Sequence, residues 1–107
     1  ATMSRADWQN GKQQVEEVEQ ALVEAFNRGV QPGSEEANAL AERHRASLFF
    51  FEVTPAKHAI LARGYVEDAR FKAHYEKLAP GLAEWLREVI FENARAHGVD
   101  PEKTTWG

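Results

Sequence analysis

The sequence contains no cysteine, no long apolar run and no excess of basic residues. The lack of cysteine excludes disulfides, thiolate metal sites and a thiol nucleophile, and it fits a reducing compartment. No run reaches the ~18 apolar residues that a membrane helix needs, and the start of the chain lacks the apolar region of a signal peptide. These absences predict a soluble, cytoplasmic protein with no membrane partner.

The charge balance is acidic. Thirteen Lys and Arg residues stand against seventeen Asp and Glu residues, giving a formal net charge of −4. Proteins hold nucleic-acid backbones through clustered basic side chains, because most of that affinity comes from counterion release. We therefore expect no direct nucleic-acid contact by this chain.

Catalytic signatures are missing as well. No Ser/His/Asp order, nucleophile elbow or Gly-rich phosphate loop is present. Carboxylates such as Glu16–Glu17, Glu35–Glu36 and Asp68 are explained as solvated faces, helix N-terminal charges or a cap. His44 and His58 are fourteen residues apart and lack a metal-binding spacing. The sequence thus predicts no catalytic residue, no metal, no cofactor and no enzyme activity.

Helical periodicity recurs along the chain, whereas the alternating pattern of strands is almost absent. With 107 residues, 43% of them hydrophobic, the chain is predicted to form one all-α, compact domain of about five helices, spanning residues 1–107. We assign residues 1–7 to a linker or tag, 8–29 to a first helix, 34–98 to a helical core and 99–107 to a tail.

Helix boundaries are marked by capping residues. Starts are expected at Ser34, at Thr54 followed by Pro55, at Asp68 and at Pro80, and stops at Gly29 and Gly98. On the helix that is expected to start at Asp68, Phe71, Tyr75 and Leu78 are predicted to face inward. His74 and His97 are predicted to be exposed.

The first helix has features of a movable element. Gly11 weakens its early turns, and Gln31-Pro32-Gly33 breaks the chain behind it. Its apolar stripe begins at Trp8 and ends near Phe26. We predict a mobile lid that closes over a cavity when a ligand fills it, since ligand contacts would offset the ordering entropy.

Residues 44 to 82 combine many aromatic side chains with His44 and His58. The run Leu48-Phe49-Phe50-Phe51 places large apolar groups all around a helix, so the helix end is either engulfed or partly lines a cavity. His44 and His58 lie on apolar stripes, where each is either a satisfied core histidine or a polar anchor in a pocket.

From about Trp8 to His97 the chain resembles the TipAS-type antibiotic-recognition domain, the effector-binding module of a branch of MerR-like transcription regulators. The resemblance is most specific over one gapless stretch with two flanking motifs: His58, Tyr65-Val66-x-Asp68-x-Arg70-Phe71, Tyr75, Pro80-Gly81-Leu82-x-x-Trp85, Glu42-Arg43-His44-Arg45 and Asn93-Ala94.

This resemblance implies an all-helical, globin-like fold whose cleft accepts large hydrophobic, often peptide-derived antibiotics. It also implies amino-terminal helices that can order when a ligand binds. Carried over by position, the residues implied to line the cleft are Trp8, His44, Phe50, Phe51, His58, Tyr65, Phe71 and Tyr75.

Two departures from the family pattern shape the expected function. Thiopeptide-binding members have a cysteine in the short segment after the aromatic cluster, where this chain has Val53, so binding must be noncovalent. The chain also lacks a helix-turn-helix, so a DNA-binding domain would belong to a longer, full-length regulator. We expect either the effector-sensing domain of such a regulator or a stand-alone drug-sequestering protein. The alternative is a helical protein-interaction or dimerisation module without a small-molecule ligand.

Overall fold

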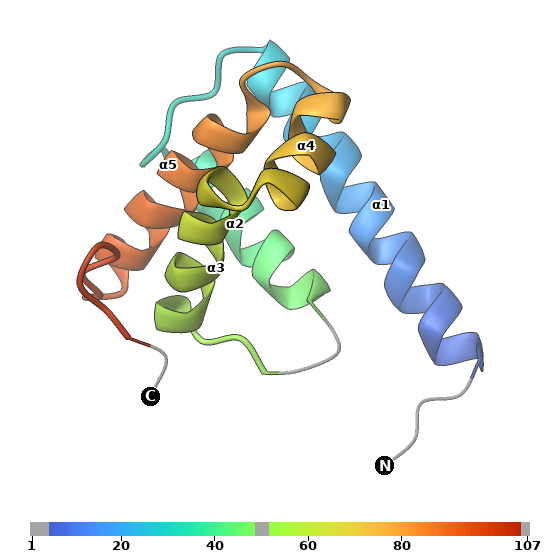
Figure 1. Cartoon of the computed structure of the whole chain (residues 1–107), viewed down its shortest axis with the longest axis horizontal. Helices are drawn as coiled ribbons and strands as arrows, with labels where there is room; N and C mark the ends of the chain where they lie inside the picture. Colours follow the sequence, from blue (N-terminus) through green and yellow to red (C-terminus); the bar gives the residue numbers. More distant parts are fainter. Residues whose placement is uncertain (1–4, 49–51, 106–107) are drawn as a thin grey trace.

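A computed structural model describes residues 5–48 and 52–105 of the chain, and it contains five helices (Figure 1). The prediction of an all-α, single compact domain is confirmed. The helices are α1 (Arg5–Asn27), α2 (Glu35–Ser47), α3 (Pro55–Glu67), α4 (Ala69–Leu78) and α5 (Leu82–Ala96).

Helix α5 is the central element, because it packs against each of the other four helices. Its apolar positions recur at helical spacing, so one broad face is removed from water. Alanines of α3 pack on this face and allow a close approach of the two helices. The fully buried part of the core includes Leu22, Ala25, Ala59, Ala62, Leu82, Ala83, Leu86 and Ile90.

Three of the predicted helix starts are confirmed by their capping hydrogen bonds. The Ser34 hydroxyl accepts from the backbone N–H of Ala37 at 3.1 Å, and the Thr54 hydroxyl accepts from that of Lys57 at 3.2 Å. The Asp68 carboxylate accepts from the N–H of Arg70 at 2.9 Å and begins α4. Each side chain satisfies a helix N–H that has no partner within the helix.

The predicted start of the last helix at Pro80 is wrong, because α5 begins at Leu82. Gly81 is the N-cap residue and has a φ of 88°, a left-handed conformation that favours glycine. Glycine has no side chain to cap the helix. The carboxylate of Glu76 does so instead, accepting from the N–H groups of Gly81 at 3.0 Å and Ala83 at 3.1 Å. These bonds lower the pKa of Glu76.

Two residues of α4 that were predicted to face inward are exposed. Phe71 keeps 49% of its surface accessible and Leu78 keeps 38%, whereas Tyr75 between them is buried. The reason is that α4 packs mainly on α3 and α5, and a ten-residue helix buries only a narrow stripe against them. The exposure of Phe71 matters below because its ring lines a pocket.

The segment between α1 and α2 is held by Trp85. The indole N–H of Trp85 donates to the carbonyl of Val30 at 2.9 Å, and its ring packs against Phe26 with centroids 5.6 Å apart. The carboxyl-terminal segment is tied to α3, where Arg63 donates to the carbonyls of Glu102 and Thr104, both at 2.9 Å. Side-chain to backbone bonds therefore position the irregular segments at both ends of the bundle.

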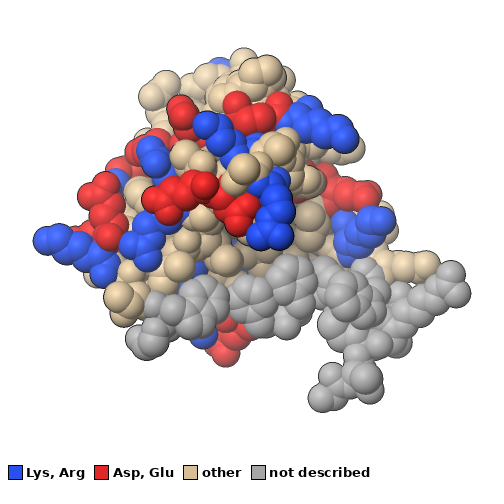
Figure 2. All heavy atoms as spheres, viewed as in Figure 1, with Lys and Arg blue, Asp and Glu red and all other residues tan. Residues whose placement is uncertain are grey.

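Charges of both signs are interspersed on the face seen in Figure 2, rather than gathered in one basic patch. The predicted exposure of His74 and His97 is confirmed. Among the described residues, no helix has the length and apolar character needed to cross a membrane.

Replacing Glu76 with alanine should lower the free energy of unfolding by about 1 kcal/mol at pH 7, because the first turn of α5 loses its acceptor. Since the pKa of Glu76 is lowered in the folded state, its contribution is present above the unfolded pKa and is lost as pH falls through the folded value. Urea unfolding at pH 7 and at pH 3 measures both effects. Glu67→Ala, at an exposed glutamate, is the matched control, and an equal loss in both variants would contradict the capping role.

Candidate ligand-binding site

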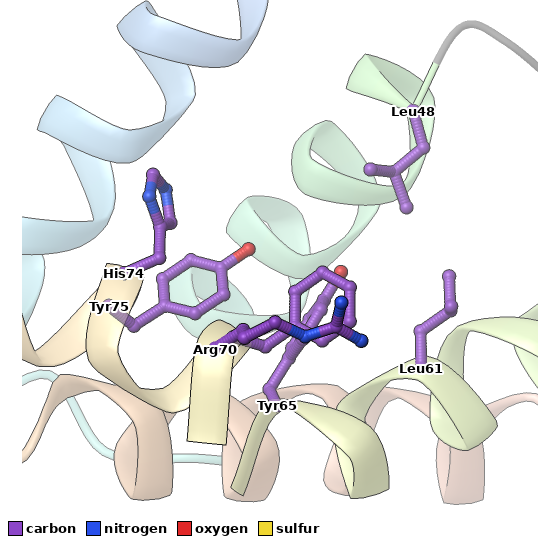
Figure 3. Close-up of a pocket in the computed structure, with 7 residues that line it drawn as sticks. Leu48, Leu61, Tyr65, Arg70, His74 and Tyr75 are labelled. Carbon is purple, nitrogen blue, oxygen red and sulfur yellow. The ribbon is translucent and has the colours of Figure 1, made fainter. Parts of the chain in front are cut away.

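A pocket of about 650 Å³ lies between the end of α2 and helices α3 and α4. Figure 3 shows its wall, in which Leu48 comes from the end of α2, two residues come from α3 and the rest from α4. Most of this wall is apolar or aromatic. The residues lining it are Leu48, Leu61, Tyr65, Arg70, Phe71, His74 and Tyr75.

The tight junction between α3 and α4 assembles the aromatic part of the wall. Asp68 ends α3 and caps α4, so the two helices meet with no intervening loop. This brings the ring of Tyr65 to 5.8 Å from that of Phe71 and to 4.9 Å from that of Tyr75, measured between centroids. Such tilted aromatic pairs are favourable and give the wall a fixed shape.

Behind this wall, the two histidines form one buried hydrogen-bonded chain with Tyr75. The Nδ1 atom of His44 lies 2.9 Å from Nε2 of His58, and the Nε2 atom of His44 lies 3.1 Å from the hydroxyl of Tyr75. His44 is 3% exposed and His58 is 1% exposed. The chain therefore links α2, α3 and α4 through polar groups inside an apolar core.

Both imidazoles are neutral at physiological pH. Burial lowers the pKa of His44 from its ordinary value of 6.5 to about 4. Burial, helped by the nearby His44 and Arg45, lowers the pKa of His58 to about 2. Burial also raises the pKa of Tyr65 to about 12 and raises that of Tyr75. All four groups therefore act as neutral hydrogen-bonding groups.

A second polar cluster holds the backbone at Val53, just before α3. The Glu42 carboxylate accepts from Arg45 at 2.5 Å and from the amide of Asn93 at 2.6 Å. Arg45 in turn donates to the carbonyl of Val53 at 2.8 Å. Because Val53 lies just before α3, this cluster ties the carboxyl-terminal part of α2 and the start of α3 to α5.

Helix α1 reaches the pocket region through a contact between Glu19 and His74 of α4. The Glu19 carboxylate lies 2.6 Å from Nε2 of His74, which also lines the pocket. In Figure 1 the amino-terminal turns of α1 continue beyond the other helices, and residues 12–14 and 16–17 are exposed. The carboxyl-terminal half of α1 contributes Leu22 and Ala25 to the core.

The structure brings together five of the eight residues implied to line a cleft. Tyr65, Phe71 and Tyr75 line the pocket, and His44 and His58 lie behind it. The other three lie outside the described part: Phe50 and Phe51 entirely, and Trp8 as regards its side chain, although its backbone belongs to α1.

Four lining residues were not identified as site residues from the sequence. Leu48 and Leu61 are apolar residues of a helical pattern, and such a pattern does not distinguish a core position from a pocket wall. Arg70 belongs to the motif that carries the family resemblance, and its place in that motif could have indicated a site residue. His74 was predicted only to be exposed. Among the described residues, no group of three or more His, Asp or Glu side chains could hold a metal ion.

The geometry thus defines a small helical domain with an apolar, aromatic pocket, and comparison with known proteins agrees. Residues 1–93 match the model of the TipAS antibiotic-recognition domain. The chain is 30% identical over 99 residues to the HTH-type transcriptional activator TipA of Streptomyces coelicolor, covering 91% of this chain and 39% of that protein. It is 31% identical over 94 residues to the HTH-type transcriptional regulator SkgA of Caulobacter vibrioides, covering 85% and 37%. No solved structure matches.

The chain belongs to the TipAS antibiotic-recognition domain family. TipAS domains are non-enzymatic binding domains of transcription regulators. The chain spans about two fifths of the length of these relatives.

Stability should fall as pH decreases from about 7 to 5, because the unfolded chain takes up protons that buried His44 and His58 exclude. A lowered folded pKa means that the stabilisation is complete above about 6.5 and is lost as pH falls toward the folded values. Each histidine contributes up to roughly 1.4 kcal/mol per pH unit.

Urea unfolding between pH 7 and pH 5 measures this slope. His58→Leu should make it shallower, because one of the two excluded protons is removed. Leu61→Ala, a change in the same helix without an ionisable group, should lower stability at every pH and keep the slope. Equal slopes in the wild type and His58→Leu would show that the pair does not control the acid response.

Proposed function

We propose that this domain binds hydrophobic small molecules or peptide-derived antibiotics noncovalently in the pocket beside α4. The observation that carries the proposal is the pocket itself: about 650 Å³, largely apolar, with the half-exposed ring of Phe71 on its wall. Pockets of this volume and lining suit drug-sized ligands, which gain affinity from apolar burial and ring stacking.

The proposed contacts divide into two groups. Tyr65, Phe71 and Tyr75 form the aromatic wall against which a ligand ring can stack, and His44 and His58 support that wall from behind. Trp8, Phe50 and Phe51 are proposed to complete the site from the lid helix and from the segment between α2 and α3. Binding is noncovalent, because the chain has no cysteine and has the apolar Val53 where thiopeptide-binding members have one.

Two settings fit this activity. In a full-length MerR-like regulator, ligand binding would shift the state of an attached DNA-binding domain, provided that the ligand contacts differ between the two states. As a separate protein, the domain would sequester the drug. The relatives are HTH-type regulators, which favours the first setting and a cytoplasmic location.

An interaction or dimerisation module is the second candidate, and one observation favours it. Phe71 and Leu78 expose two large apolar side chains on one helix, as a partner-binding face would. The two candidate functions predict different effects of substituting Phe71 and Leu78. Phe71 lines the pocket described above and Leu78 does not, so only the Phe71 substitution should affect ligand binding.

Phe71→Ala should weaken binding of a hydrophobic antibiotic about tenfold or more, through loss of ring contact. It should change unfolding free energy by less than about 1 kcal/mol, because the side chain is half-exposed. A thermal-shift screen of peptide-like antibiotics and aromatic drugs, followed by calorimetry, measures both. Leu78→Ala is the matched control on the same helix and should bind as the wild type does. Equal effects of the two variants on self-association, without ligand binding, would favour the interaction module.

Ligand binding should also slow amide hydrogen exchange in the first turns of α1, because a closed lid adds contacts to this part of the chain. The fluorescence of Trp8 should change in a saturable way, and Trp8→Phe should remove that change while keeping the rise in melting temperature. Protection confined to α3 and α4 would argue against a lid role for α1.

A further inference from the structure

The buried chain of four polar side chains ends in an unpaired atom. Its order runs from Tyr65 and Tyr75 at the pocket wall to His44 and then His58. The Nδ1 atom of His58 is buried and has no hydrogen-bond partner among the described residues. A buried polar group of this kind needs an explanation, because most such groups are paired.

The protons of the chain can be arranged in two ways. Each imidazole is neutral and carries one proton, and each contact needs one donor and one acceptor. In the inward order, Tyr75 donates to His44, His44 donates from Nδ1 to His58, and His58 is left with an unpaired Nδ1–H. In the outward order, His58 donates from Nε2 to His44, and His44 donates from Nε2 to the oxygen of Tyr75.

The outward order is favoured by what surrounds His58. It leaves only a lone pair at the unpaired Nδ1, whereas the inward order buries an N–H without an acceptor, which proteins rarely tolerate. The guanidinium of Arg45 lies near enough to His58 to disfavour its protonation, and a positive field also favours a lone pair over an N–H.

In the outward order the last proton of the chain lies at the pocket. The oxygen of Tyr75 accepts from His44, so its O–H is free to donate to the ligand or to Tyr65. If Tyr65 accepts that bond, its own O–H becomes the donor. In Figure 3 both hydroxyl oxygens point away from the backbones of α3 and α4.

The other polar groups of the wall, Arg70 and His74, lie on exposed side chains that form ion pairs at the surface. Arg70 pairs with Asp68 at 3.3 Å, and His74 lies 2.6 Å from Glu19. The remaining lining residues, Leu48, Leu61 and Phe71, are apolar. The tyrosine hydroxyls are therefore the buried donors of the wall, whereas Arg70 carries its N–H groups on a side chain that is 89% exposed.

We propose that Tyr65 and Tyr75 present a hydrogen-bond donor to the pocket and that the site selects hydrophobic ligands carrying a carbonyl acceptor. The His44–His58 pair keeps the hydrogen bonds of the chain in the outward order. The inference rests on the proposed function of the pocket. It makes the tyrosines specificity-determining residues and the histidines positioning residues that act through them.

Three rigid, planar probes of nearly equal shape test this selectivity. Fluorenone carries a carbonyl acceptor, carbazole an N–H donor and fluorene a methylene at the same position. Fluorenone should bind at least about fivefold tighter than carbazole, since a donor facing a donor leaves both unpaired. NMR titration of the full chain measures the three affinities. Tyr65→Phe and Tyr75→Phe together should reduce the affinity for fluorenone to that for fluorene.

The positioning role of the histidines has its own readout. Nitrogen-15 NMR of the wild type should show the Nε2–H tautomer at both His44 and His58. In His58→Leu the proton order is no longer fixed, so the ratio of the affinities for fluorenone and carbazole should fall toward one, whatever the change in the affinity for fluorene. A merely structural role would weaken binding of all three probes by the same factor and would leave that ratio unchanged.

The outcomes separate the two proposals. Equal affinities for the three probes would overturn the inference and leave the pocket as a binding site. If none of the three probes binds, the inference and the proposed function are both overturned. An Nδ1–H tautomer at His58, or tighter binding of carbazole than of fluorenone, would show that the chain has the opposite polarity.

Discussion

The hydrogen-bonded chain through His58, His44 and Tyr75 is the constraint on which the pocket depends. It joins α2, α3 and α4 inside the core, where each polar group would destabilise the fold if it lost its partner. The chain also fixes the position of Tyr75, against which Tyr65 and the half-exposed Phe71 assemble. A polar interaction in the core thus sets the shape of an apolar surface, because directional bonds specify a geometry that apolar contacts alone leave free.

Much of the helical framework could be predicted from local chemistry. Three helix caps accept hydrogen bonds from N–H groups only two or three residues away, namely Ser34, Thr54 and Asp68. Short stretches of sequence are therefore enough to predict them. The start of α5 could not be predicted in the same way. Its cap is Glu76, a residue of the preceding helix, which reaches Gly81 and Ala83 only once the turn between α4 and α5 has formed.

The candidate site was predictable only in part, for a similar reason. Helical periodicity shows that His44, His58 and Tyr65 lie on apolar faces, but it does not distinguish a core position from a pocket wall. That distinction depends on how much of a face its neighbours cover. Phe71 and Tyr75 are four residues apart and share a face of α4, yet one is half-exposed and the other is buried. The short junction at Asp68 places Phe71 beyond the edge of the core. The periodicity of the sequence does not show where that edge lies.

The division of α1 into two parts limits what a ligand can order. Leu22 and Ala25 anchor its carboxyl-terminal half in the core, and Glu19 contacts His74 at the pocket. Fixing the backbone costs about 1 kcal/mol per residue, so ordering all 23 residues of α1 would cost roughly 20 kcal/mol. Micromolar binding yields only about 8 kcal/mol. A ligand can therefore be coupled to the first turns of α1 but not to the whole helix. Because α1 is already helical from Arg5 and its carboxyl-terminal half is anchored, closure of the proposed lid needs only the first turns to pack, which avoids the cost of nucleating a new helix.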